Sequence, residues 1–331
     1  MTVTALTHDS GSSRTAAGLL LAFASATSFG MSGVLARGLL DTGWSAGAAV
    51  TVRTVIAATV LIVPGLLAVH GRWHLLRDNA GLVTVYGISA VAGAQLCYFY
   101  AVTYMQVSVA LLLEYTAPVA VVLWLWLRHG HRPSGLTVLG AAIAASGLVL
   151  VLDVISGAEL STIGVLWALG AMVGAASYFI ISADHGNGLP GITLAAGGLL
   201  VAALVLLAAG VAGVLPFDAA TAPAMYDGHA VAWWLPVLAL GLVTAAFAYV
   251  TGIEAGRRLG SRLASFVALG EVLAAVVFAW LVLGELPRAV QLAGGLLVLA
   301  GVVVVKLGEG RAPLVVEPLP EPEPLSERPA A

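Results

Sequence analysis

Long apolar runs separated by short polar stretches dominate the pattern along the chain. A transmembrane helix needs about 20 apolar residues, because the hydrocarbon core is about 30 Å thick. Transmembrane β-strands would instead alternate apolar and polar residues over about ten positions, whereas these runs are continuous. The pattern therefore predicts an all-α integral membrane protein with ten transmembrane helices, at residues 16–37, 45–69, 81–103, 107–127, 134–153, 161–183, 191–212, 232–255, 260–283 and 288–307.

The basic residues are distributed unevenly across such an arrangement. With the N-terminus inside, the outer segments hold only Arg37 and Arg288, and Arg53 lies within a span. The inner segments hold the other eleven of the 14 Lys and Arg residues: Arg14, Arg72, Arg77, Arg128, Arg132, Arg257, Arg258, Arg262, Lys306, Arg311 and Arg328. Cytoplasmic loops carry the excess of Lys and Arg. We therefore expect a multi-pass protein of the inner (plasma) membrane with both termini in the cytoplasm.

Composition agrees with a protein that is covered by a lipid bilayer. Charged residues make up 9% and hydrophobic residues 60% of the chain, and the mean hydropathy is +1.02. Soluble domains carry about 25% charged residues, which this chain lacks. The net charge of −3 also argues against nucleic acid as a partner, because no basic face would neutralise phosphates.

The two ends of the chain differ from the apolar region. Residues 1–15 are predicted to be a retained cytoplasmic tail, since the apolar run that follows is longer than that of a cleaved signal peptide. Residues 308–331 are rich in proline and glutamate, which favours a disordered cytoplasmic tail. The folded part is therefore expected within 16–307.

The apolar region repeats itself. An offset of 154 residues places Ala101 on Ala255, Pro133 on Pro287, Gly140 on Gly294 and Gly147 on Gly301. We infer two five-helix repeats, 16–153 and 161–307. Because five is odd, the second repeat would be inverted in the membrane. Inverted repeats are typical of secondary transporters, which bind a small molecule near the midplane and expose it to each side in turn.

Several motifs resemble those of a known family. They are Arg53 in the second span, the run from Ala110 to Pro118, the pair Gly270 and Glu271, the pair Gly284 and Glu285, and the run from Gln291 to Gly295. Residues 16–307 thus resemble the EamA domains of the drug/metabolite transporter superfamily. The strings 113–118 and 257–262 look like the threonine/homoserine exporter branch. The resemblance implies a carrier, with amino-acid export as its activity.

Two positions depart from that family's pattern. Val272 follows Glu271 where the family usually has a proline, and residues 128–131 replace a glycine–glutamate pair at the end of the fourth span. The first departure weakens the expectation of a kink in the ninth span. The second makes the two repeats less alike.

Few ionisable residues lie within the predicted spans, and each costs about 2.5–3.5 kcal/mol there on insertion scales. Arg53 and Glu114 both lie roughly 10–12 Å below the outer surface, so we expect a charge pair between them. Pro118 would crowd the carbonyl of Glu114, four residues earlier, and kink the helix beside this carboxylate. Arg53 and Glu114 could pin two spans together, contact substrate or handle protons, and these alternatives stay open.

Glu271 lies near the predicted midplane with no evident cation in its own repeat. A carboxyl group buried without a partner favours its protonated form. Glu271 could therefore carry the proton of an antiporter or contact the substrate directly. A different role is expected for Glu254 and Arg257, which lie three apart on one helix face and suit an interfacial ion pair.

Other polar side chains within the spans extend this candidate substrate-binding site. They are Gln95, Tyr98, Tyr100, Tyr115, Tyr178 and Tyr249. Each could simply hydrogen-bond to a neighbouring helix. Together they suit an amino-acid-like solute, whose ammonium group would face the carboxylates. Efflux of a drug or organic cation is the alternative, favoured if the carboxylates face an otherwise apolar, aromatic cavity.

Enzyme and channel functions fit the sequence less well. Gly30 to Gly33 resemble an intramembrane serine-protease motif, but no histidine lies deep in a span to act as the base for Ser32. No motif for a metal or nucleotide cofactor occurs, so no cofactor is expected. No ring of like charges suggests a channel. The sequence therefore favours a non-enzymatic carrier driven by solute or ion gradients.

Overall fold

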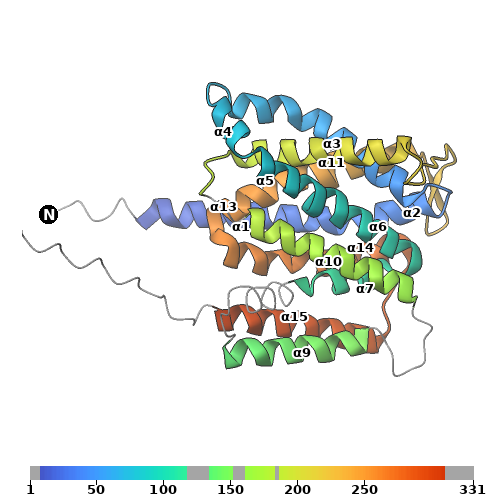
Figure 1. The fold of residues 1–331 in the computed structure, drawn as a ribbon. Helices are drawn as coiled ribbons and strands as arrows, with labels where there is room; N and C mark the ends of the chain where they lie inside the picture. Colours follow the sequence, from blue (N-terminus) through green and yellow to red (C-terminus); the bar gives the residue numbers. More distant parts are fainter. Residues whose placement is uncertain (1–7, 118–133, 152–160, 183–185, 310–331) are drawn as a thin grey trace, which may run out of the picture.

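A computed structural model describes residues 8–117, 134–151, 161–182 and 186–309 of the chain. In the first half, the chain forms α1 (His8–Gly30), α2 (Ser32–Leu40), α3 (Ala46–Ala68), α4 (Trp73–Asp78), α5 (Ala80–Val85), η1 (Tyr86–Gly93), α6 (Ala94–Tyr104), α7 (Val107–Glu114) and α9 (Gly135–Val151). The label η denotes a π-helical segment. Figure 1 shows these helices as a bundle with roughly parallel axes.

The second half forms α10 (Thr162–Ser182), α11 (Gly191–Val211), β1 (Ala224–Tyr226), β2 (His229–Val231), α12 (Trp234–Gly241), η3 (Leu242–Phe247), α13 (Ala248–Ala268), α14 (Gly270–Leu283) and α15 (Ala289–Glu309). Six of the described helical segments are long and apolar enough to cross a membrane, and α9, α14 and α15 contain shorter apolar helices. The chain is therefore a multi-pass helical membrane protein.

Most predicted spans correspond to helices, but the first, third, fourth, eighth and ninth are each interrupted, and α13 runs on through 256–259, where the sequence predicts that two spans separate. The first span breaks at Met31, between α1 and α2. The third and eighth spans each pass through a π-helical segment, η1 and η3. The pattern of apolar residues does not predict these interruptions, because the residues on both sides of each one are equally apolar.

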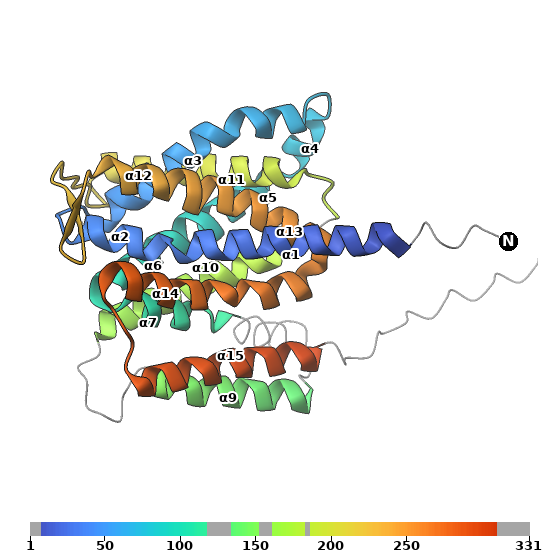
Figure 2. The ribbon, with the colours of Figure 1, turned by 180° about the vertical axis from the view of Figure 1, so that it is seen from behind.

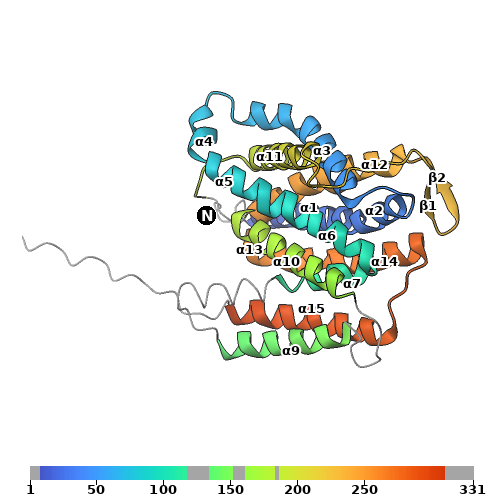
Figure 3. The same ribbon diagram turned by 45° about the vertical axis from the view of Figure 1, so that its right-hand side comes forward.

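Equivalent helices of the two halves pack against each other in antiparallel fashion. Gly140 of α9 lies against Gly301 of α15, and Gly147 lies against Gly294. Without side chains at these positions, the two backbones approach closely, as small residues permit in membrane helices. In Figures 1 and 3, α9 and α15 lie side by side at one edge of the bundle. The glycines matched at an offset of 154 are thus the residues that join the halves here.

The remaining helices also pair across the halves. The helix α3 packs on α11, α1 on α13 and α6 on α10. Gly87, in η1, lies against Val201, and Gly241, just before η3, lies against Ile56. These two contacts are equivalent, since Gly241 follows Gly87 by 154 residues and Val201 follows Ile56 by 145. The contacts of one half therefore recur in the other.

A β-hairpin covers the end of the bundle opposite α4 (Figures 1 and 2). Asp227 and Gly228 both have positive φ, 46° and 79°, as the tightest hairpin turns require. Tyr226 packs on Gly38, and its hydroxyl donates to the carbonyl of Leu35 at 2.9 Å. The hairpin is thus fastened to α2. The beginning of α1 and the end of α15 lie at the opposite, α4 end (Figure 2).

Candidate functional site

Arg53 is the most deeply buried charge that the structure describes, with 1% of its surface exposed. It lies in the middle of α3 and donates hydrogen bonds to the side-chain oxygen of Gln95 and to the backbone carbonyl of Thr244. Its guanidinium carbon also lies 5.5 Å from the centre of the Phe99 ring. Arg53 therefore links α3 to α6 and, across the halves, to η3.

The two π-helical segments provide backbone acceptors for this cluster. A π-helical turn replaces the regular pattern of backbone hydrogen bonds and often occurs at functional sites. The carbonyl of Thr244, in η3, accepts from Arg53, and the carbonyl of Ala90, in η1, accepts from the hydroxyl of Tyr249 at 3.5 Å. Each segment is thus bound by a side chain from the opposite half.

Glu271 lies in the first turn of α14, directly after the helix interruption at Leu269. The hydroxyl of Tyr115 donates to its carboxylate at 2.5 Å. Gly30 lies against the backbone of this turn, so that α1 also packs here. The site therefore has one carboxylate held in place by a hydrogen bond from the other half.

Glu114 is the last residue of α7, and a turn at Tyr115 and Thr116 follows it. Its carboxylate makes no hydrogen bond or ion pair to the described residues. The proline predicted to kink this helix, Pro118, lies outside the described residues. Leu269 follows Tyr115 by 154 residues, so the fourth and ninth spans are interrupted at equivalent positions, although the ninth has Val272 in place of a proline.

The expected contact between Arg53 and Glu114 does not form. Among the described residues, the ion pairs are Arg37 with Asp41 and Arg258 with Glu254. Arg53, Glu114 and Glu271 nevertheless lie near enough to act on one another electrostatically. Arg53 is compensated by neutral acceptors instead, because Gln95 and Thr244 lie closer to its guanidinium.

The structure brings together most of the side chains singled out from the sequence. Tyr249 stacks edge-on against Phe29, at 5.1 Å between ring centres, and against Tyr178, at 5.9 Å. Tyr98 lies close enough to Arg53 and to the carboxylates of Glu114 and Glu271 to interact with them electrostatically. We define the central cluster as the charged and polar residues that meet here: Arg53, Gln95, Tyr98, Glu114, Tyr115, Tyr178, Tyr249 and Glu271.

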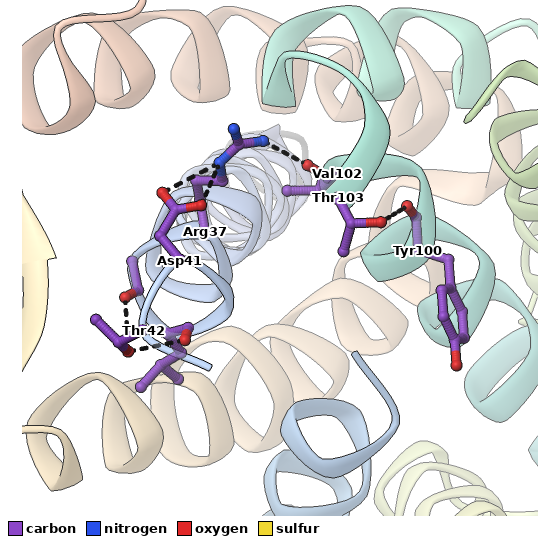
Figure 4. A network of polar contacts seen from close by, with 8 residues as sticks. Arg37, Asp41, Thr42, Tyr100, Val102 and Thr103 are labelled. Atoms are coloured by element: carbon purple, nitrogen blue, oxygen red, sulfur yellow. Dashed lines mark hydrogen bonds and ion pairs between the residues drawn. The ribbon is translucent and has the colours of Figure 1, made fainter. Parts of the chain in front are cut away.

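Tyr100 is the predicted site residue that lies elsewhere. Its ring stacks on Trp167 at 4.6 Å between centres, on the far side of α6 from Tyr98. In Figure 4, its side chain points away from the contact between Arg37 and Val102. The side chains of Tyr98 and Tyr100 diverge because residues two apart on a helix do not share a face. Tyr100 therefore serves packing between α6 and α10.

Sequence reasoning missed several residues beside the central cluster. Tyr86 is fully buried and lies 6.2 Å from Tyr178 between ring centres. Phe29 and Phe99 add aromatic surface, and Thr244 adds its carbonyl. Their apolar or small side chains resemble those of any membrane helix, so only the three-dimensional structure identifies them.

Hydrogen bonds tie the hairpin end of the bundle together. Arg37 donates to the carbonyl of Val102 at 2.6 Å and pairs with Asp41 (Figure 4). Trp44 donates to the carbonyl of Ala220 at 2.7 Å. Burial raises the pKa of Glu285 in the neighbouring loop, and Arg37 partly offsets this. These hydrogen bonds therefore hold the helices and loops together at the hairpin end of the bundle.

The opposite end of the bundle is also tied, but differently from the prediction. Arg257 donates to the carbonyl of Leu189 at 2.5 Å. Glu254 pairs with Arg258, four residues later, at 2.8 Å. The expected pair of Glu254 with Arg257 is therefore wrong, because Arg257 faces the end of the neighbouring loop instead.

The geometry around Ser32 gives no sign of a protease. Its hydroxyl is buried and has no hydrogen-bond partner among the described residues. Among the histidines whose side chains the structure describes, His70 lies before α4, His74 lies within α4, and His229 lies in the hairpin. Ser32 thus has no described base beside it, whereas the central cluster has carboxylates and tyrosines but no nucleophile with a base.

Taken together, a bundle of helices that places an arginine, two half-buried carboxylates and several tyrosines between its two halves is typical of a membrane transporter. The EamA-like transporter family matches residues 16–153 and 162–307. The chain therefore belongs to this family and contains two of its repeats.

Other comparisons inform the fold alone. One solved structure, described only as a crystal structure of a protein, is 22% identical with a TM-score of 0.59. The similarity covers 91% of this chain and 99% of the other. None of the curated proteins compared with the chain matches it.

Proposed function

We propose that the protein is a secondary transporter that carries a small polar metabolite with an ammonium group by alternating access. The observation that supports this most is the carboxylate of Glu114, which has no hydrogen-bond or ion-pair partner among the described residues. It lies within electrostatic reach of Glu271, inside a protein of a transporter family. A carboxylate that is partly withdrawn from water costs free energy unless it is paired, and a bound cation would compensate it.

The proposal includes ten spans in two inverted repeats. Antiparallel packing of α9 on α15 supports the inversion, since the two helices end equivalent repeats. Arg72, Arg77, Arg257 and Arg258 gather at the end of the bundle where α1 begins and α15 ends. By the excess of basic residues in cytoplasmic loops, this end faces the cytoplasm of an inner membrane.

An amino acid is the first substrate class that we propose, with export as the direction. Its ammonium group would bind the carboxylates, and Tyr98 and Tyr249 would bind its polar atoms. For its carboxylate, Arg53 offers the Nε atom, which is buried without a hydrogen-bond partner among the described residues. A cation and two carboxylates at one site suit a zwitterion.

An organic cation is the second candidate. The central cluster is bordered by the rings of Phe29, Phe99 and Tyr178. Aromatic faces attract organic cations, and such a substrate would need no contact with Arg53. Whether Arg53 is needed for substrate binding therefore separates the two candidates.

Counterflow in proteoliposomes tests the proposal. Vesicles preloaded with an unlabelled amino acid should take up the same labelled amino acid faster than empty vesicles, and mixtures of amino acids and of organic amines can be screened in this way. Failure of every amino acid and every amine to support counterflow would refute the carrier proposal. Proton coupling is a further part of it: uptake unchanged by collapse of the proton gradient would exclude coupling.

A further inference from the structure

An apolar pocket lies away from the central cluster, between α3, α4, α5 and α11. It has a volume of about 230 Å³ and includes no residue of the central cluster. Its walls are mostly aliphatic and include Gly65, Leu66, Ala196 and two hydroxyl-bearing residues, Thr84 and Thr193. We call this pocket the lateral groove.

The walls of the lateral groove offer nothing to a polar solute. Its two hydroxyls are already used, since Thr193 donates to the carbonyl of Gly65 at 2.9 Å and Thr84 to that of Ala80 at 2.8 Å. Apolar cavities of about 150 Å³ stay dry and accept apolar ligands of the size of benzene. The lateral groove is larger, and its walls suit a hydrocarbon chain.

Position in the membrane indicates what can enter. Both α3 and α11 are membrane-crossing helices, and Leu66 on the rim is 41% exposed. At this depth, an open apolar groove faces lipid tails rather than water. The occupant is therefore expected to come from the bilayer.

The rim toward the end of the membrane span is basic. Arg72 and Arg77 are exposed at the two ends of α4, next to one acidic residue, Asp78. Trp73 is 50% exposed, as is common at the depth of lipid headgroups. Basic residues at this depth attract anionic headgroups, roughly fivefold in affinity for each arginine.

The equivalent place in the second half is covered by the chain itself. The helix α11 begins 145 residues after α3, at Gly191 against Ala46, so that Gly210 is the counterpart of Gly65. A side chain at Gly210 would meet the ring of Phe217 at 3.2 Å. In the first half, a side chain at Gly65 would instead meet Ala196 of α11 at 2.5 Å, and the lateral groove, which both residues line, opens beside this contact.

From these observations, we propose that the lateral groove binds one anionic phospholipid. An acyl chain lies between α3, α5 and α11, and the phosphate-bearing headgroup lies against Arg72 and Arg77. One wall of the groove comes from the first repeat and the other, α11, from the second. The bound lipid therefore stabilises the contact between the two repeats.

Thermal unfolding of the detergent-solubilised protein tests the proposal. Cys97, the one cysteine of the chain, can report unfolding through a thiol-reactive dye. Phosphatidylglycerol should raise the unfolding midpoint at concentrations about fivefold to thirtyfold lower than phosphatidylcholine, because ligands that bind the folded state stabilise it. Equal effects of the two lipids would overturn the proposal.

Variants locate the binding. Thr84→Phe should fill the lateral groove and abolish the rise. Thr59→Phe is the matched control, since Thr59 is exposed on α3 outside the groove and makes the same kind of local hydrogen bond. If Thr84→Phe does not fold, Leu66→Phe on the opposite wall serves the same purpose. An unchanged rise in the filled variants would overturn the proposal, as would an unchanged lipid preference in an Arg72→Gln, Arg77→Gln double variant.

Discussion

The two halves share their geometry and differ in their chemistry. Each half has a π-helical segment, and each has a helix interruption beside a carboxylate, after Glu114 and before Glu271. Among the described residues, the buried cation belongs to the first half. The counterpart of Arg53, 145 residues later, is Gly198, which packs against the ring of Tyr86. The repeat thus provides a symmetric framework, and unequal side chains make one site of it rather than two.

A second difference concerns the helices that begin the halves. The first span breaks at Met31, whereas its counterpart α10 runs without interruption from Thr162 to Ser182. The hairpin belongs to the second half and holds α2 through Tyr226. The part of the first span next to the hairpin, α2, is therefore a separate unit with its own contacts. Four substitutions test which of these differences matter.

The largest effect is expected from removing Arg53, the buried cation of the first half. Arg53→Leu leaves Gln95 and the carbonyl of Thr244 buried without their donor, at about 2–5 kcal/mol of folding free energy in total. Thermal unfolding should show this loss. Arg258→Leu, which breaks an exposed pair, should cost less than about 1 kcal/mol. Equal losses for the two variants would mean that Arg53 does not bind the halves together.

A carboxylate substitution should reduce transport without unfolding the protein. Glu114→Gln removes a charge that has no described partner, and one charged contact to a substrate ammonium is worth about 1.5–3 kcal/mol. Counterflow should therefore fall about 10- to 100-fold. Glu254→Gln, at the surface pair with Arg258, is the control and should transport normally. Full activity of Glu114→Gln would remove the main support for a cationic substrate group.

The antiparallel contact of the last helices can be tested with one methyl group. In Gly147→Ala, the added Cβ would lie 2.6 Å from the backbone of Gly294, and overpacking of this kind costs about 1–3 kcal/mol. Gly256→Ala is the control, because a Cβ there meets nothing within 4 Å. Helix propensity predicts that it gains about 0.5–1 kcal/mol. A neutral Gly147→Ala would argue against close packing of α9 on α15.

The smallest effect is expected where the second half departs from the family pattern. Val272→Pro would restore the usual proline after Glu271. The amide of Val272 bonds to the carbonyl of Leu269 at 3.2 Å, and proline in a first helical turn loses little. The unfolding midpoint should change by the equivalent of less than about 1 kcal/mol. A large loss would show that α14 does not begin where the structure places it.

The sequence predicts the apolar helices well because the bilayer imposes a length on each of them. The predicted boundaries 191–212 for α11 and 45–69 for α3 differ from the structure by no more than one residue at each end. It also predicts most of the central cluster, since a buried Arg53 or Glu271 stands out in an apolar run. Tyr100 lies outside this cluster, against Trp167, because the sequence does not show which face of α6 turns inward.

What the sequence does not reveal is backbone geometry inside continuous apolar runs. The π-helical segments η1 and η3 consist of ordinary membrane-helix residues. The break at Leu269 lacks a proline, and the one at Met31 has only glycine and serine beside it. Tertiary contacts, such as Gly30 against the turn of Glu271, decide where these helices break. The hairpin turn at Asp227 and Gly228, in contrast, could have been predicted from its dipeptide.

The pairing of α9 with α15 has a consequence for how the halves depend on each other. Each of these helices finds its main neighbour in the opposite repeat, at the edge of the bundle (Figure 3). Neither half alone can therefore cover the glycine face of its own last helix. A chain cut between Val151 and Ser161 would yield two fragments, each with an unmatched glycine face, and co-expression should let them reassemble. The pair of α9 and α15 thus joins the two repeats at this edge of the bundle.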